Sequence, residues 1–531
     1  MKAKRRTKVF QSFSFSVRSP KSESWFRGFL LIVFIFVVCL PAMGKEDDWL
    51  TYLGNKTQSK APPKHMSAAE ALPPLPLPAT PLRRTERKKP PQPDYLVGKV
   101  IWGESASFVD SSGDKMDIAD WNLCPTDMEN LVGNGRSMDL KYHWQNVNLN
   151  DFHFDAKKLP ALLFSGVRTL RLSQTHIQGL REYVLSGGMI ICDSIAGSPY
   201  FYDSARKVFL EAFPECRFRE IPADHPLYHM LTDVEKVQYP KQSGTTKPFL
   251  EGMYIGSRIG VLVSKYGLGC GWNRDLTRLE KLPKSVYYDI KSANEIGLNL
   301  AAYIVGYAEV GLLEGQPEVF GQADEKRPTD EFVFAQLKHE GAWNVHPGGA
   351  TALLMKLRQY TAIRVNLKRV AVDAAEDDLS SYPFLYLTGL DDFSFSPEAT
   401  GALQRYLNFG GVLLINNGMG LGTFDRAVRR ELARILPDAR LEPVSANHNL
   451  YNSLLPIEKV SYSPVVAKNK PELKNEPYIL GVTIDGDLRV LYSPYDIEAG
   501  WLDAYYPLIR GYESIHAQKL GLNIITYVMT H

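Results

Sequence analysis

Three side chains of this 531-residue sequence are candidates for acid–base chemistry: Asp193, His225 and His448. The histidines occupy matched segments, Ala-Asp-His and Ala-Asn-His. A catalytic base also needs a nucleophile or an orienting carboxylate in reach, and Asp224 beside His225 is a neighbour in sequence only. Asp193 has Asn416 at its matched position, and an amide cannot act as an acid or a base. All three are weak candidates for catalysis, and packing or loop fixing is the alternative for the histidines.

A second set of residues has the character of a ligand pocket rather than of a reactive centre. Its members follow apolar runs or belong to Trp-Asn pairs. They are Trp121, Asn122, Gly166, Ser194, Trp343, Asn344, Gly389, Asp391, Asn416 and Asn417. Because ligands of open parallel sheets bind beyond the carboxyl ends of the strands, these positions predict a cleft with polar groups and an aromatic wall. In the alternative interpretation the glycines make tight turns and the tryptophans close the edge of the core.

Several motifs of catalysis and cofactor binding are missing from the sequence. It has no G-x-S-x-G or G-x-C-x-G nucleophile elbow, no P-loop and no H-E-x-x-H. Gly267, Gly269 and Gly271 have the spacing G-x-G-x-G, which differs from the dinucleotide fingerprint, and no helix is expected to follow them. We therefore predict no cofactor and no metal.

Four cysteines lie beyond the N-terminal segment, all in the first half of the chain: Cys124, Cys192, Cys216 and Cys270. No C-x-x-C spacing supports a zinc site. Buried unpaired thiols and a single disulfide are both open interpretations. Cys124 lies near a Trp-Asn pair and Cys270 precedes Gly-Trp, so a disulfide between Cys124 and Cys270 could fasten the rim of the predicted cleft.

Two halves of the sequence repeat one another. Residues 159–196 align with residues 382–418, and Trp121-Asn122 precedes Trp343-Asn344 by 222 positions. Gly187-Gly188 precedes Gly410-Gly411 by 223 positions. Landmarks that keep register over about 200 residues indicate a tandem duplication of a domain, because solenoid repeats have far shorter periods.

Each copy alternates strands and helices. The buried run 384–387 is followed by the N-cap Ser396 with Pro397 behind it, and Gly410-Gly411 ends the helix. The other elements that we expect in the second copy are a strand at 333–337, a helix at 349–360, a strand at 412–415, a helix at 425–436 and a hairpin around 485–487. In the first copy, Ser173 is the matching cap and 189–192 the matching strand. This alternation predicts α/β domains with mainly parallel sheets.

The second copy resembles the bacterial domain-of-unknown-function family 4159. The resemblance lies in FVFAQLKHEGAWNVHP, in the run from Tyr382 to Asn417, in FDRAVRRELARILPDARLEP and in GLNIITYVMTH. It implies a flavodoxin-like sheet similar to that of class I glutamine amidotransferases and of the trehalose-utilisation protein ThuA. In those amidotransferases a cysteine occupies an elbow, whereas Cys192 here ends a strand and has Ile415 as its counterpart. The resemblance therefore implies the fold without the amidotransferase activity.

The N-terminal residues indicate export. Basic residues precede the apolar run 28–40, which is shorter than the roughly 20 residues of a membrane-spanning helix. Residues 1–44 are predicted to be a signal peptide, with an uncut signal anchor as the alternative. Residues 45–94 are rich in proline and are predicted to be a linker. Two α/β domains are expected at 95–312 and 328–531.

The overall balance of charge limits the choice of partners. Lys and Arg number 61 and Asp and Glu number 59, so no strongly basic face for nucleic acid is expected. We predict a periplasmic or cell-envelope protein that contacts membrane only through its N-terminal segment. Its leading function is non-catalytic binding of an envelope ligand or a protein partner. The alternative is a hydrolase acting on envelope carbohydrate or peptide.

Overall fold

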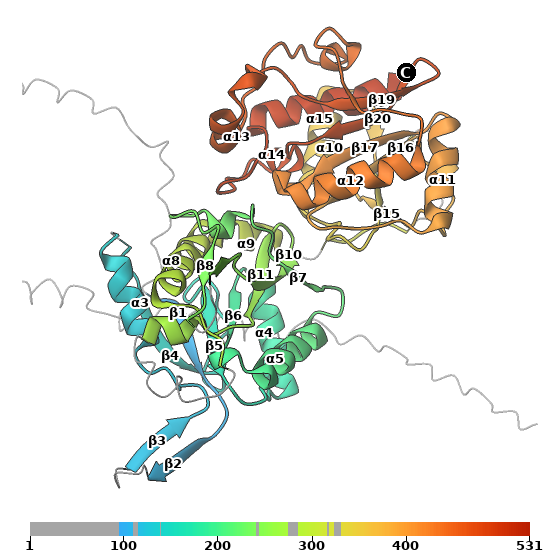
Figure 1. The fold of residues 1–531 in the computed structure, drawn as a ribbon. Helices are drawn as coiled ribbons and strands as arrows, with labels where there is room; N and C mark the ends of the chain where they lie inside the picture. The colour runs from blue at the N-terminus through green and yellow to red at the C-terminus, as the bar shows by residue number, and fades with distance from the viewer. Residues whose placement is uncertain are drawn as a thin grey trace, which may run out of the picture. The chain divides into compact units, whose positions relative to one another are not determined.

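Two seven-stranded sheets follow one another along the chain (Figure 1). The computed structural model describes residues 95–109, 115–138, 140–240, 244–273, 285–315, 318–322 and 331–530. The predicted signal segment, 1–44, and the predicted linker, 45–94, lie outside the described residues. The mixed α/β class in two tandem domains is as the sequence predicts, while the exact domain boundaries stay predictions.

The first sheet has the strand order β4-β1-β5-β6-β11-β10-β7. Neighbouring strands from β4 to β11 are parallel, and β10 and β7 complete the edge in antiparallel pairs. The five parallel strands taken in chain order have the flavodoxin-like arrangement 2-1-3-4-5. The bounds are β1 Tyr95–Ile101, β4 His143–Asn148, β5 Ala161–Gly166, β6 Met189–Ser194, β7 Phe218–Glu220, β10 Leu250–Ile255 and β11 Arg258–Ser264.

The second sheet repeats this order as β15-β13-β16-β17-β20-β19-β18. Strands β15 to β20 are again parallel, and β19 and β18 are antiparallel. The bounds are β13 Ala335–Leu337, β15 Val370–Val372, β16 Phe384–Gly389, β17 Val412–Asn417, β18 Glu442–Pro443, β19 Leu480–Ile484 and β20 Asp487–Ser493. Three two-stranded ladders lie outside the large sheets. They pair β2 Ser105–Val109 with β3 Lys115–Ala119, β8 Val237–Gln238 with β9 Thr245–Thr246, and β12 Glu331–Phe332 with β14 Arg364–Val365.

Helices cover both faces of each sheet. Alternate residues of a buried strand point to opposite faces, so each sheet contributes to two apolar layers. In the second domain, Tyr386 and Leu414 belong to one layer and Leu385 and Leu413 to the other. The helices of the first domain are α3 Asp127–Arg136, α4 Gln174–Leu185, α5 Pro199–Ala212, α6 Leu268–Asn273, α8 Ile290–Gly306 and α9 Ala308–Glu314. Those of the second are α10 Gly349–Tyr360, α11 Pro397–Asn408, α12 Gly422–Ile435, α13 Pro464–Asn469, α14 Glu498–Trp501 and α15 Ser514–Thr530. Short 3₁₀ turns are η2 Ile195–Gly197, η3 Pro226–Tyr228, η4 Leu379–Ser381, η5 Gly418–Gly420, η6 Asn449–Asn452 and η7 Pro471–Leu473.

The predicted helix caps are present. The Ser396 hydroxyl accepts a hydrogen bond from the amide of Ala399 at 3.1 Å, and Ser173 does the same for His176 at 3.2 Å. Gly410 ends its helix with φ of +100°, a left-handed conformation that glycine adopts at little cost. The helix at 349–360 and the hairpin at 485–487 are also present.

Three expected elements differ from the structure. The opening strand of the second copy is shorter than 333–337, because residues 331–332 pair with β14 and only 335–337 join the large sheet. Helix α12 begins at Gly422 rather than at Asp425. The glycine-rich stretch at 267–271 is not a loop, since Gly269 and Gly271 lie inside α6. Gly271 packs where an added Cβ would lie 2.4 Å from the Ala293 side chain, so close helix contact accounts for that glycine.

The two domains share part of their core, and residues 90–531 form one compact unit. An apolar cluster of the first domain continues into Leu390, Met419 and Tyr506 of the second. Polar contacts join the same surfaces, because the Asp224 carboxylate accepts from the Arg510 guanidinium at 2.7 Å. The interface is therefore a packed extension of the core rather than a loose contact.

Within the described part of the chain, no single helix has the length and hydropathy needed to cross a membrane. Helices α8 and α9 satisfy that criterion only when taken together across a bend of 52°. Many residues of α8 are buried in the core of the first domain, as expected for an apolar core helix.

Candidate functional site

The carboxyl ends of β13 and β16 form the switch point of the second sheet. The connection after β13 leads to β15 on one side, whereas the connection after β16 leads to β17 on the other. Such a divergence creates the crevice in which open α/β sheets bind ligands. His339 follows β13 and Asp391 follows β16, and the amide of Asp391 donates to the carbonyl of Gly341 at 3.1 Å.

His339 fills the inner part of this crevice. Its Nε2 lies 2.7 Å from the Thr388 carbonyl, and its Nδ1 accepts from the amide of Gly341 at 3.0 Å. Burial lowers the pKa of His339 to about 4, so the ring is neutral at neutral pH. Both ring nitrogens are occupied, and His339 is therefore a packing group rather than a base.

Gly389 and Gly166 make room for aromatic rings at matched positions. A Cβ on Gly389 would lie 2.7 Å from the His339 ring, and one on Gly166 would lie 2.3 Å from the Trp102 ring. Trp102 in turn donates its indole N–H to the carbonyl of Ser165 at 3.0 Å. Gly389 and Gly166 thus permit a close approach of protein side chains, a role that differs from the tight turns of the alternative interpretation.

A cavity of about 420 Å³ lies at the outer end of this crevice, between the second domain and the β7 edge of the first. Three predicted site residues, Trp343, Asn344 and Asp391, line it together. The first domain contributes Arg219 and Tyr254. This volume is within the usual range for small-molecule sites, so the cavity is the candidate binding site.

Asp391 is the most unusual group in the cavity wall. Its side chain is only 5% exposed, yet its carboxylate makes no hydrogen bond or ion pair with the part of the chain that the structure describes. Burial raises the pKa of Asp391 to about 6, and the positive charge of Arg219 offsets part of that rise. The buried hydroxyl of Tyr254 in the same wall also has no partner among the described residues. The Asp391 oxygens are not among the fully buried unpartnered atoms of the described residues, so they reach the open space of the cavity without a protein partner, whereas the Tyr254 hydroxyl is fully buried.

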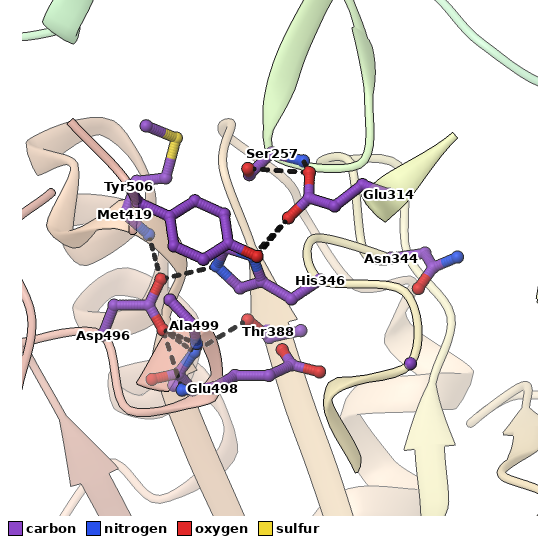
Figure 2. Close-up of polar contacts among 12 residues, drawn as sticks. Ser257, Glu314, Asn344, His346, Thr388, Met419, Asp496, Glu498, Ala499 and Tyr506 are labelled. Atoms are coloured by element: carbon purple, nitrogen blue, oxygen red, sulfur yellow. Dashed lines mark hydrogen bonds and ion pairs between the residues drawn. The ribbon is translucent and has the colours of Figure 1, made fainter. Parts of the chain in front are cut away.

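A buried cluster of charged groups supports the cavity from behind, and His346 is at its centre (Figure 2). The imidazole Nδ1 lies 2.8 Å from Glu314 and Nε2 lies 2.8 Å from Asp496. Burial by itself would lower the pKa of His346, but the two carboxylates outweigh it and raise the pKa well above its usual value. His346 is therefore an imidazolium that donates from both nitrogens.

Asp496 is surrounded by donors. It accepts from the Asn416 side chain at 3.0 Å and from the amides of Met419 at 2.7 Å, Glu498 at 2.9 Å and Ala499 at 3.2 Å. Burial would raise the pKa of Asp496, yet His346 and these donors together lower it. Asp496 is thus a stable anion with no free lone pair directed toward a substrate.

Arg369 links this cluster to the cavity. Its guanidinium forms ion pairs with Glu318 and with Glu498, the latter at 3.2 Å, and holds the Asn344 side-chain oxygen at 3.0 Å. Burial raises the pKa of Glu498 to about 7. Figure 2 shows the Asn344 side chain with its nitrogen directed away from His346. Because its oxygen is held by Arg369, Asn344 presents its amide N–H groups to the cavity that it lines.

The first domain has a corresponding cluster that is closed. Lys99 donates to both Asp127 oxygens at 2.8 Å, to the Cys124 carbonyl at 2.9 Å and to the Asn122 oxygen at 3.1 Å. Asp193 accepts from the amides of Leu268 and Gly269, each at 2.7 Å. Burial raises the pKa of Asp193 to about 7. Asp193 is 0% exposed and serves the N-terminus of α6, so it has no access to a substrate.

The matched histidines have a shared structural role. The Nδ1 of His225 accepts from the amide of Leu227 at 3.1 Å, and the Nδ1 of His448 accepts from the amide of Leu450 at 3.1 Å. Each histidine thereby caps a 3₁₀ turn. Burial lowers the pKa of His225 to about 3. Neither histidine lines the cavity, and their geometry is that of loop-fixing residues.

The other predicted binding residues lie elsewhere. Ser194 is fully buried, and the Asn417 side chain donates to the carbonyl of Pro494 at 3.1 Å. Asn122 holds Lys99 as described above, and the carbonyl of Trp121 accepts from the Ser165 hydroxyl at 3.1 Å. The residues that sequence reasoning missed are Arg219, Tyr254, Glu314, His346 and Asp496. Of these residues, only His346 could have been noticed in the sequence. It lies two residues after the Trp343-Asn344 pair, at the position that Cys124 has after Trp121-Asn122.

Cys124 and Cys270 are adjacent in the structure. Both are buried thiols, and hydrogen bonding to Cys270 together with burial raises the pKa of Cys124 well above its usual value. The Cys270 sulfur also accepts from the amide of Ala196 at 3.3 Å. The two groups are in contact without being bonded, so the disulfide stays a prediction. Among the described residues, no group of three or more His, Cys, Asp or Glu side chains is arranged to hold a metal ion.

The fold and the site define a protein of two duplicated, doubly wound α/β domains with a cavity at the switch point of the second. The chain belongs to the family described as domain of unknown function (DUF4159), which matches residues 114–305 and 333–529. The two matches correspond to the two copies found in the sequence. No curated protein matches the chain.

Proposed function

We propose that this protein is a non-catalytic binding module of the cell envelope and that the cavity beside Asp391 is its ligand site. The observation that carries the proposal is a carboxylate, almost fully buried and without partners, in the wall of a cavity of about 420 Å³. Leaving a buried polar group unsatisfied costs free energy, and such a cost persists in natural proteins mainly where function requires it. A bound ligand would supply the missing partners.

Catalysis has weaker support. The groups that could act as acid or base, His339, His346 and Asp496, are each held by at least two protein partners. A general base must accept a proton from a reacting group, which these saturated side chains cannot do without breaking the cluster. The hydrolase alternative therefore rests on Asp391 and on Cys216, a free thiol in the same cavity wall. Burial raises the pKa of Cys216 to about 12, so this thiol is not an activated nucleophile.

Envelope location is part of the proposal and rests on the N-terminal sequence. The basic segment, the apolar run 28–40 and the proline-rich segment 45–94 favour export and tethering. A relation to the glutamine amidotransferase-like fold is likewise proposed, on the strength of the 2-1-3-4-5 strand order. That relation carries no activity here, because the order alone is shared by many unrelated functions.

The test is retention of envelope fragments by the purified full-length protein. Enzymatically solubilised cell-wall fragments are incubated with protein, separated by ultrafiltration and identified by mass. We expect retained fragments of unchanged mass, and loss of retention in Trp343→Ala. Phe409→Ala is the matched control, because Phe409 is an exposed aromatic outside the cavity lining. Fragments cleaved during incubation would support the hydrolase instead, and retention unaffected by Trp343→Ala would place the site elsewhere.

A further inference from the structure

The charged side chains of the cavity wall are mostly paired with one another. Arg181 pairs with Glu215 at 2.7 Å and Arg217 pairs with Glu340 at 3.1 Å. Glu314 and Glu318 are held by the cluster behind the cavity. Among the described residues of the cavity wall, one cation, Arg219, and one anion, Asp391, then have no ion-pair partner.

Arg219 and Asp391 face the same space without forming an ion pair. The Arg219 guanidinium donates to the Glu340 carbonyl at 3.0 Å and makes no ion pair with a described carboxylate. Asp391 also lacks one, although the charge of Arg219 influences its pKa. The two groups therefore line one cavity and interact electrostatically without being paired with each other.

We infer that the cavity binds a zwitterion of the amino-acid or short-peptide class, with its ammonium group on Asp391 and its carboxylate on Arg219. This inference rests on the proposed binding function and specifies its ligand. A zwitterion provides a partner of opposite sign for each charge and leaves the net charge of the cavity unchanged. A neutral sugar would leave Asp391, which is largely buried, without a counter-ion, and an anionic ligand would bring a second negative charge beside it.

The remaining wall groups suit the rest of such a ligand. Asn344 lines the cavity and its side-chain oxygen is held by Arg369, which leaves its amide N–H groups for a ligand. They can donate to the peptide carbonyl of a dipeptide. Trp343 gives an apolar wall, half-buried and packed on Phe320 with a centroid distance of 5.1 Å, against which an aliphatic side chain can lie.

The experiment compares three matched probes by calorimetry: L-alanyl-L-alanine, its N-acetyl derivative and its C-terminal amide. We expect the wild-type full-length protein to bind the unmodified dipeptide about tenfold or more tightly than either derivative, since each derivative loses one charge-assisted contact. In Asp391→Asn the dipeptide and its N-acetyl derivative should bind equally. In Arg219→Gln the dipeptide and its amide should bind equally. Arg217→Gln is the matched control, because Arg217 is already paired with Glu340.

The outcomes separate this inference from the proposed function. If all three probes fail while cell-wall fragments are still retained through Trp343, the zwitterion is wrong and the binding function stands. The same conclusion holds if a neutral disaccharide binds in an Asp391-dependent manner. If neither the probes nor the fragments bind, both proposals are wrong. A dipeptide that binds equally well to all variants would place its site outside this cavity.

Discussion

The two copies meet the same structural need with different residues. In each, a short helix follows the fifth parallel strand, and its first amides need an acceptor. In the first domain the acceptor is Asp193, at the end of β6. In the second domain the strand-end residue is Asn416, whose side-chain oxygen accepts from the amide of Ile497 at 2.9 Å. Asp496, in the loop before α14, accepts from the amides of Glu498 and Ala499. The carboxylate lies at the end of the fourth parallel strand in the first domain and after the fifth in the second, and in both domains it accepts from the first amides of the short helix, α6 or α14.

A second acceptor also differs between the copies. The Cys270 sulfur accepts from the amide of Ala196, and at the matched place an oxygen of Asp496 accepts from the amide of Met419. Asp496 therefore accepts from the amides of Glu498 and Met419, which match amides held by Asp193 and Cys270 in the first copy, while Asn416 keeps the amide of Ile497. The duplication thus preserved the backbone amides that donate, while the side chains that accept from them changed position.

The consequence is that only the second cluster reaches beyond its own domain. Asp496 also holds His346, which holds Glu314 at the end of α9. The first domain has Cys124 at the place of His346, and Cys124 contacts only its own domain through Cys270. The first cluster is a closed core feature, and the second is coupled to the helix that joins the copies.

The largest expected effect comes from breaking that coupling. In His346→Ala the cluster loses an imidazolium and leaves Glu314 and Asp496 buried without it, so we expect a loss of about 3–5 kcal/mol in the free energy of unfolding. Urea denaturation at neutral pH measures it. Cys124→Ala, at the matched place in the first domain, should cost only about 1 kcal/mol. Equal losses in the two variants would contradict the difference between the clusters.

A gain in stability is expected at the cavity. The pKa of Asp391 in the folded protein is about 6, above its ordinary value of 3.8. The free energy of unfolding therefore falls as the pH rises from about 4 to about 6, and it stays at the lower value above pH 6. Asp391→Asn should therefore raise the free energy of unfolding above pH 6, by on the order of 2 kcal/mol. Thermal melts at pH 4 and pH 7 test this, because the gain should vanish at pH 4.

Two matched variants sharpen this prediction. Asp224 is paired with Arg510, and its pKa is lowered, so Asp224→Asn should destabilise at pH 7. In the first domain the place of Asp391 is taken by Arg168, which pairs with Asp120, and Arg168→Gln should have little effect because the arginine is exposed. If Asp391→Asn destabilised as Asp224→Asn does, Asp391 would have a protein partner and the case for a ligand would weaken.

The smallest effect is a transplant between copies. Asp193→Asn imitates Asn416 and should cost about 1 kcal/mol, because one helix amide loses its acceptor. The triple variant Asp193→Asn, Gly267→Asp, Cys270→Ala imitates the second copy and should recover most of that loss in urea denaturation. Without Cys270→Ala it should not, since a Cβ at Gly267 would lie 2.5 Å from the Cys270 sulfur. A triple variant less stable than Asp193→Asn alone would show that the exchange depends on further differences.

Local chemistry made the scaffold predictable from the sequence. Ser396, Pro397 and Gly410 determine helix ends through their own backbone preferences, and the duplication allowed each element to be read twice. The mainly parallel sheets then followed from the alternation of strands and helices, whereas the strand order comes from the structure.

The site was less accessible to prediction, for reasons of geometry. Asp391 was predicted because strand-end position is visible in the sequence, and Trp343 and Asn344 because the Trp-Asn pair recurs in both copies. Arg219 and Tyr254 come from the other domain, and no local pattern shows which edge of one copy packs on the other. The role of His346 depends on Glu314 and Asp496, 32 and 150 positions away, and sequence spacing does not reveal such partners.

The bridge from Glu314 to His346 has a consequence for how the protein can be divided. The family match to the second copy begins at residue 333, whereas one carboxylate that keeps His346 charged is at 314. A fragment cut at the boundary that homology suggests would carry a buried histidine with half of its counter-charge, and that histidine would release its proton at lower pH. The duplicated unit is therefore shorter than the unit that folds. The last turn of α9 precedes the second domain in the sequence but contributes Glu314 to its core.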